Sequence, residues 1–209
     1  MLSSLQNIVL FYLNKTKNIL FCAIINQIFK KRIIMMKKLI LSIVALLVIG
    51  VGALFAINGK DNYDPTKYHT TATNGINVGS KLSIKLPDQF DKAHEVSDDT
   101  QKIIFVFAKA TGHTVREYLK QQPKDFLPSR HTLFIADISG MPAVIRNTFA
   151  LPDFRKSPYS VLLIYDKNIA KTLKDEKNAD KITIATLKNK EITSLKYIST
   201  EDELKAELK

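Results

Sequence analysis

The fold is indicated by residues 102–115, KIIFVFAKATGHTV, around which the rest of the chain is organised. Residues 103–108 form an unbroken apolar run rich in β-branched and aromatic side chains, which predicts a strand buried on both faces. Residues 109–114 contain a glycine beside a threonine and predict a turn into a helix over residues 115–122. The end of a buried strand followed by a helix start is a common place for ligands and reacting groups in α/β proteins.

Strand and helix patterns alternate on either side of this stretch. A hairpin is expected before it, at residues 82–86 and 93–96. The later strands are expected at residues 132–138, 159–165, 182–187 and 192–198, and the later helices at residues 141–149, 168–177 and after Thr200. Alternation of this kind predicts an α/β fold with parallel pairing. The expected architecture is a three-layer sandwich with a central mixed sheet, helices on both faces and an N-terminal hairpin.

Three local signals set expected element boundaries. Leu151-Pro152 is expected to break the second helix, because proline lacks the N–H that a helix interior requires. Asn189-Lys190 predicts a tight turn between the last two strands. Thr200 and Glu203 have the spacing of a capping box at the start of the last helix.

The N-terminal part of the chain contains a candidate membrane span. The 19 residues 39–57 carry no charge, and Lys37 and Lys38 precede them. This length is sufficient for a helix to cross a bilayer, and the positive-inside rule places residue 59 onward outside the cytoplasm. The segment is either an uncleaved signal anchor or a cleaved signal peptide, and both export the domain. The expected location is the inner (cytoplasmic) membrane, as a single-pass protein with a periplasmic C-terminal domain.

Composition divides the chain into four parts. Residues 1–34 differ from the rest and derive either from an incorrectly assigned start codon or from a cytoplasmic amphipathic segment. Residues 35–58 contain the span, residues 59–75 are polar and read as a linker, and residues 76–209 form the expected domain.

The net charge of +11 does not predict nucleic-acid binding. Seven basic residues and no acidic ones precede residue 59, so the remainder carries 24 basic and 20 acidic residues, as in a mixed solvated surface. Cys22 is the single cysteine. The sequence therefore allows no intramolecular disulfide and no cysteine-based zinc cluster.

Four short stretches carry a resemblance to a known family. They are residues 78–90, with Val78-Gly79 and Leu86-Pro87-Asp88; residues 102–114; residues 162–170, with Tyr165-Asp166; and residues 187–192. In this order they resemble the thioredoxin-like superfamily, in its peroxiredoxin and TlpA-like branch, and more narrowly the exported YtfJ-type proteins. The resemblance covers about residues 75–209.

The resemblance implies a redox fold without its redox residues. The family's two cysteine positions fall on Thr111 and Thr114, and a hydroxyl cannot replace a thiolate in disulfide exchange. The chain can be aligned with the family in two ways. In the longer register, Lys181 stands where the family usually has a cis-proline, whereas a simpler thioredoxin register would place Ser157-Pro158 there. The longer register is preferred because it accounts for the extra strand and helix that residues 162–170 resemble. No catalytic residue is therefore assigned.

The expected binding face lies at the carboxyl edge of the sheet. Its residues are Thr111, Gly112, His113, Thr114, Asp137 and Ser139. His113 is either a general base or metal ligand or, more simply, a solvated histidine, and Asp137 and Ser139 either flank a ligand or cap a helix. Arg116, Lys109 and His113 are a further candidate anion site. No metal or cofactor is expected.

The functional expectation is a binding or scaffold module in the cell envelope. In redox relatives this face receives an extended polypeptide, which suggests an envelope protein as the partner. The alternative is a non-thiol oxidoreductase with a bound flavin or metal, and a third interpretation is a structural protein that packs with itself.

Overall fold

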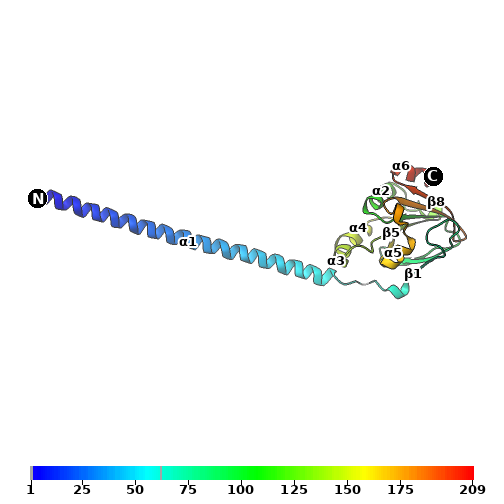
Figure 1. The fold of residues 1–209 in the computed structure, drawn as a ribbon, viewed down its shortest axis with the longest axis horizontal. Coiled ribbons are helices and arrows are strands. Elements are labelled where there is room, and N and C mark those ends of the chain that lie inside the picture. The colour runs from blue at the N-terminus through cyan, green and yellow to red at the C-terminus, as the bar shows by residue number, and fades with distance from the viewer. Residues whose placement is uncertain (1, 62) are drawn as a thin grey trace. The chain divides into compact units, whose positions relative to one another are not determined.

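The chain is organised into two units, residues 1–56 and residues 57–209. The computed structural model describes residues 2–61 and 63–209, and the side chains among them from residue 25 onward, so the side chain of Cys22 lies outside the described part. The first unit is the helix α1 (Leu2–Asn58), drawn in blue to cyan in Figure 1. The last two residues of α1 belong to the second unit.

The apolar part of α1 is long enough to cross a membrane. Residues 25–58 meet the length and hydropathy expected of a span, and their large apolar side chains are exposed. The uncharged stretch 39–57 rises by about 28 Å as a helix, close to the thickness of a hydrocarbon core. The helix runs without interruption through residues 34 and 35, where the sequence suggested a division.

The second unit is built on a five-stranded sheet. The strands are β4 (Lys102–Val106), β5 (Thr132–Asp137), β6 (Leu162–Ile164), β7 (Ile182–Lys188) and β8 (Glu191–Ile198), in the order β6-β5-β4-β7-β8. The first three are mutually parallel, whereas β7 is antiparallel to β4 and β8 is antiparallel to β7. The sheet is therefore mixed, as expected.

The alternation of strands and helices also predicts parallel pairing for residues 182–187, but this strand, β7, is antiparallel to β4. Residues 165–181 leave the carboxyl end of β6 and deliver the chain to Ile182, which pairs with Val106 at the carboxyl end of β4. A parallel partner would require the connection to return to the opposite end of the sheet. Because the connection stays at one end, β7 has to run antiparallel.

A smaller antiparallel sheet covers one face of the main sheet. It consists of β1 (His69–Ala72), β2 (Leu82–Pro87) and β3 (Ala93–Glu95). The expected hairpin is confirmed as β2 and β3. The strand β1 lies within residues 59–75, where the sequence suggested a linker, so the ordered domain begins earlier than residue 76.

The buried run of β4 contributes to two cores. Ile104 and Val106 pack on one face with the helices α2 (Lys109–Lys120) and α6 (Glu201–Glu207). Ile103 and Phe105 pack on the other face with the small sheet and α5 (Lys167–Leu173). Burial of β4 on both faces and helices on both faces are thus confirmed (Figure 1).

Residues 143–154 form a helical stretch that differs from the prediction. It comprises α3 (Ala143–Ile145), the π-helical turn η3 (Arg146–Ala150) and α4 (Leu151–Phe154). Pro152 does not end the helix. It is one of the first two residues of α4, directly after a change of helical pitch, where a missing N–H is tolerated.

The remaining boundaries follow local chemistry. Asn189 and Lys190 both have positive φ, as a tight hairpin turn requires. The Thr200 hydroxyl accepts a hydrogen bond from the Glu203 backbone N–H while the Glu203 side chain reaches back, so the capping box is confirmed. Short 3₁₀ turns occur at η1 (Pro65–Lys67), η2 (Pro128–Arg130) and η4 (Glu176–Asn178).

Candidate binding cleft

The first turns of α2 hold the residues that the sequence singles out. The helix begins at Lys109, with Ala108 as its N-cap, so residues 111–114 lie inside the helix. The expectation of a turn here and a helix starting at Val115 was wrong. Ala110 favours the helix, and Gly112 is tolerated within it, its N–H donating to the Ala108 carbonyl at 3.0 Å.

Both threonine hydroxyls are bound to their own helix. Thr111 is buried, and its Oγ1 donates to the carbonyl of Ala108 at 3.0 Å. The Oγ1 of Thr114 donates to the carbonyl of Ala110 at 3.3 Å. Hydroxyls in this arrangement satisfy backbone carbonyls of the helix and are not directed at a ligand.

A cleft of about 680 Å³ opens at the carboxyl ends of β4 and β5. Its walls are the start of α2 and the helical stretch 143–154. Most of its lining is apolar: Val106, Phe107, Ala108, Phe134, Ala136, Ile138, Met141, Ile145, Phe149, Ala150 and Phe154. A concave apolar surface with a few polar groups is typical of a binding site.

The cleft brings together three of the six expected residues. Gly112, His113 and Asp137 line it, whereas Thr111, Thr114 and Ser139 are absent from its lining. The carboxylate of Asp137 accepts a hydrogen bond from the Ser139 N–H at 2.8 Å. This local turn contact favours the loop-stabilising interpretation of Asp137 and Ser139.

An ion pair closes one side of the cleft. Arg116 donates to the carboxylate of Asp153 at 2.6 Å, and its guanidinium carbon lies 4.8 Å from the centre of the Phe154 ring. The hydrogen bond from Arg116 lowers the pKa of Asp153 below its ordinary value, against the opposing effect of burial. Since Arg116 is neutralised in this way, the anion site that the sequence suggested keeps only Lys109 and His113.

Lys181 lies directly before β7, the position that the longer register assigns to it. Ile182 is the first residue of β7 and pairs with Val106, so Lys181 lies next to the end of β4 and the start of α2. Ser157 and Pro158 instead precede β6, at the edge of the sheet. The extra strand β6 and helix α5 are both present, which confirms the longer register.

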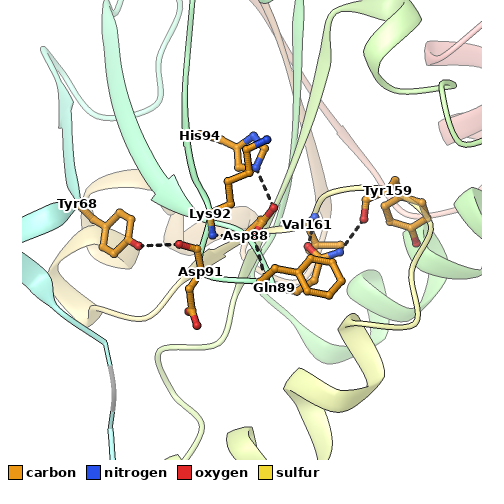
Figure 2. Close-up of polar contacts among 9 residues, drawn as sticks. Tyr68, Asp88, Gln89, Asp91, Lys92, His94, Tyr159 and Val161 are labelled. Atoms are coloured by element: carbon orange, nitrogen blue, oxygen red, sulfur yellow. Dashed lines mark hydrogen bonds and ion pairs between the residues drawn. The ribbon is translucent and has the colours of Figure 1, made fainter.

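A polar cluster that sequence reasoning missed joins the β2–β3 hairpin to the segment before β6 (Figure 2). The Gln89 side chain is buried, donates to the Tyr159 carbonyl at 2.8 Å and accepts from the Val161 N–H at 2.8 Å. The Gln89 side chain thus binds backbone groups of the segment that directly precedes β6, which begins at Leu162. The sequence signal for this cluster was Gln89, a polar residue shortly after β2. Its partners could not be predicted because they lie about 70 residues away in sequence.

The remaining histidines do not converge on His113. His94 pairs with Asp88 at 2.9 Å, and His69 lies 3.3 Å from the Ser83 hydroxyl. Within residues 25–61 and 63–209, no group of three or more His, Cys, Asp or Glu side chains is placed to hold a metal ion.

Comparisons with known proteins bear on the fold alone. No protein-family model matches the chain, and no curated protein matches its sequence. Similar solved structures include a peroxiredoxin-like protein from Aquifex aeolicus, with 9% identity, 66% of this chain and 90% of that chain covered and a TM-score of 0.42. A thioredoxin-like protein from Bacteroides caccae has 14% identity, 63% and 49% coverage and a TM-score of 0.41. A SCO1/SenC family lipoprotein from Bacillus anthracis has 10% identity, 66% and 95% coverage and a TM-score of 0.39.

The assignment of the fold rests on the order and direction of the strands. Three parallel strands are followed by an antiparallel hairpin in the order β6-β5-β4-β7-β8, and α2 starts directly after the central strand. The residues at that helix start include no cysteine, because the only cysteine of the sequence is Cys22. Residues 57–209 therefore have a thioredoxin-like fold, in which α2 starts directly after the central strand β4.

Proposed function

We propose that this protein is a membrane-anchored binding module that holds an extended segment of a partner protein in the cleft at the carboxyl edge of its sheet. The observation that carries the proposal is the apolar cleft of about 680 Å³ beside the start of α2. Gly112 and Phe107 form part of its lining, so both backbone and aromatic surface are accessible to a bound chain.

The chemistry at the helix start favours binding over thiol exchange. A thiolate would be required at residue 111 or 114, and the hydroxyls there donate to helix carbonyls instead. The polar groups of the cleft are a neutralised pair, Arg116 and Asp153, together with Lys109, His113 and Asp137. These groups can orient a peptide through hydrogen bonds and need no cofactor to do so.

The proposed location is the inner (cytoplasmic) membrane, with the domain on the extracytoplasmic side and a partner in the cell envelope. The length and hydropathy of residues 25–58 support a membrane span. Lys37 and Lys38 precede its uncharged part, which favours a cytoplasmic N-terminus. The alternative, an oxidoreductase with a bound flavin or metal, stays a prediction that the absorbance spectrum and metal content of the purified full chain would test.

Site-specific photocrosslinking in living cells tests the proposal. A photoreactive phenylalanine analogue replaces Phe107 in the cleft, and the matched control carries it at the exposed Val78, next to Gly79, which binds the β7–β8 hairpin. We expect a defined crosslinked protein from position 107 that is absent from position 78. Equal crosslinking from both positions, or crosslinks from position 107 only to a second copy of this chain, would contradict a cleft for a partner protein.

A further inference from the structure

The segment that follows α1 is packed against the domain. We name residues 58–61 and 63–72 the strap. The side-chain amide of Asn147 donates to the carbonyls of Asn58 and Lys60, both at 2.8 Å. At its far end the strap becomes β1, which pairs with β2. Both ends of the strap are therefore bound to the domain.

A buried arginine fixes the middle of the strap. The guanidinium of Arg146 lies 2.6 Å from the carboxylate of Asp61, and the Arg146 side chain is only 4% exposed. A buried cation needs its anionic partner, because an unpaired charge in the interior is strongly unfavourable. Burial by itself would raise the pKa of Asp61, but the hydrogen bonds from Arg146 and from the Tyr63 N–H, together with the charge of Arg146, lower it below its ordinary value.

Aromatic stacking extends this contact. The Arg146 guanidinium carbon lies 4.7 Å from the centre of the Tyr165 ring. The Tyr63 ring stacks on Tyr165 with centroids 4.9 Å apart, and on Tyr68 with centroids 5.5 Å apart. The strap is thus held by hydrogen bonds, an ion pair and three stacked rings, in contrast to a free tether.

The strap keeps the helical stretch 143–154 close to the point where the chain leaves the apolar span. The uncharged residues end at Ile57, and Asn58, which Asn147 binds, is the next residue. On the same stretch Ile145 and Phe149 are 45% and 62% exposed. Their spacing of four residues brings two large apolar side chains close together on the helix surface.

We propose that Ile145 and Phe149 insert into the headgroup region of the bilayer in which α1 is anchored. The inference rests on the proposed membrane anchorage and is independent of the identity of the cleft's partner. A lipid surface fits because Asn147, on the same helical stretch as these side chains, binds Asn58 directly after the span, and because exposed apolar groups at a membrane boundary are buried among headgroups and upper acyl chains. The two side chains also form part of the cleft rim, so the cleft then opens at the membrane surface.

The test uses the full chain with Cys22→Ser, reconstituted in liposomes of phosphatidylcholine and phosphatidylglycerol. An environment-sensitive fluorophore is attached at Phe149→Cys. The matched control is Val78→Cys, because Val78 is similarly exposed at 64% but lies by Gly79, which binds the β7–β8 hairpin at the amino end of the main sheet. Lipids with a nitroxide near the headgroup quench fluorophores in the interfacial region.

We expect at least about a twofold drop in fluorescence at position 149 and little change at position 78, as for a side chain at the headgroup boundary. Equal quenching at the two positions would overturn the proposal. A blue-shifted emission at position 149 without lipid quenching would also overturn it, because protein and not lipid would then cover the residue.

A second readout separates this inference from the anchorage on which it rests. Alkaline carbonate extraction of cell membranes removes peripheral proteins and leaves spanning ones. Release of the unmodified chain would contradict the proposed anchor. Retention of the chain together with equal quenching at positions 149 and 78 would contradict only the contact of Ile145 and Phe149 with lipid.

Discussion

The carboxylate of Asp88 accepts a hydrogen bond from Nε2 of His94 at 2.9 Å, across the turn that joins β2 to β3 (Figure 2). The Asp88 side chain is 4% exposed, and the N–H groups of Phe90 and Lys92 donate to its other oxygen. A buried carboxylate with three donors is stabilised in its charged form. This contact fixes the turn that positions Gln89 against the segment before β6.

Replacement of Asp88 by asparagine should destabilise the domain. The amide keeps the shape of the carboxylate but removes its charge and one acceptor oxygen, so one donor loses its partner. We expect the free energy of unfolding to fall by about 1–3 kcal/mol, measured by chemical denaturation of the full chain in detergent. Asp91→Asn is the matched control and should change little, because Asp91 has a positive φ that asparagine adopts readily.

The Asp88 contact also predicts a dependence of stability on pH. Burial would raise the pKa of Asp88, but the hydrogen bonds from His94, Phe90 and Lys92 lower it below the ordinary value of 3.8. The stabilisation is therefore complete above pH 3.8 and is lost as the pH falls through the lower pKa of the folded state. Denaturation midpoints measured from pH 6 down to about pH 3 should converge for the wild type and Asp88→Asn. Parallel curves would show that Asp88 does not titrate in this way.

Replacement of Gln89 by glutamate should be more harmful than its size suggests. The Gln89 amide group donates to the Tyr159 carbonyl, and in glutamate an oxygen would face that carbonyl. Two acceptors in contact at a buried site should lower the free energy of unfolding by at least about 2 kcal/mol. Gln101→Glu, at an exposed position, is the control. Similar denaturation midpoints for the two variants would contradict the role assigned to Gln89.

Removal of Arg116 should change the ionisation of the cleft. With Arg116→Met the pKa of Asp153 should rise towards its ordinary value of 3.8, because the hydrogen bond that lowers it is lost. Carboxyl ¹³C chemical shifts followed against pH measure this pKa directly. The pKa of Glu203 is lowered by the capping-box contacts and should stay unchanged in the same titration, which serves as an internal control. An unchanged Asp153 pKa would mean that the pair does not persist in solution.

The sequence was most informative where the deciding interactions are local. The apolar run of β4, the left-handed turn at Asn189-Lys190 and the capping box of Thr200 each depend on residues within a few positions. The order of the elements, together with four short stretches that resemble the thioredoxin-like superfamily, predicted a thioredoxin-like fold. The extra strand and helix of the longer register were predicted from the same pattern.

The features that the sequence did not reveal depend on distant partners. The direction of β7 is set by where residues 165–181 deliver the chain, and β1 is ordered by its pairing with β2. From the sequence alone Arg146 would be expected at the surface, whereas in the structure it is buried against Asp61 and Tyr165. At the candidate site, residue types alone could not show that the hydroxyls of residues 111 and 114 donate to their own helix.

Binding of the partner to variants of α2 tests the central claim most directly. A Cβ at Gly112 would lie 3.7 Å from a methyl group of Val106, so alanine fits there, whereas the larger ring of Gly112→Trp should fill the cleft. Lys120→Trp places the same side chain at the exposed far end of the helix. With the crosslinked partner purified, we expect Gly112→Trp to raise the Kd at least about 100-fold, a loss of about 2.7 kcal/mol, while Gly112→Ala and Lys120→Trp bind as the wild type does. A Kd that Gly112→Trp leaves unchanged, in a variant with a wild-type melting temperature, would contradict the cleft as the binding site.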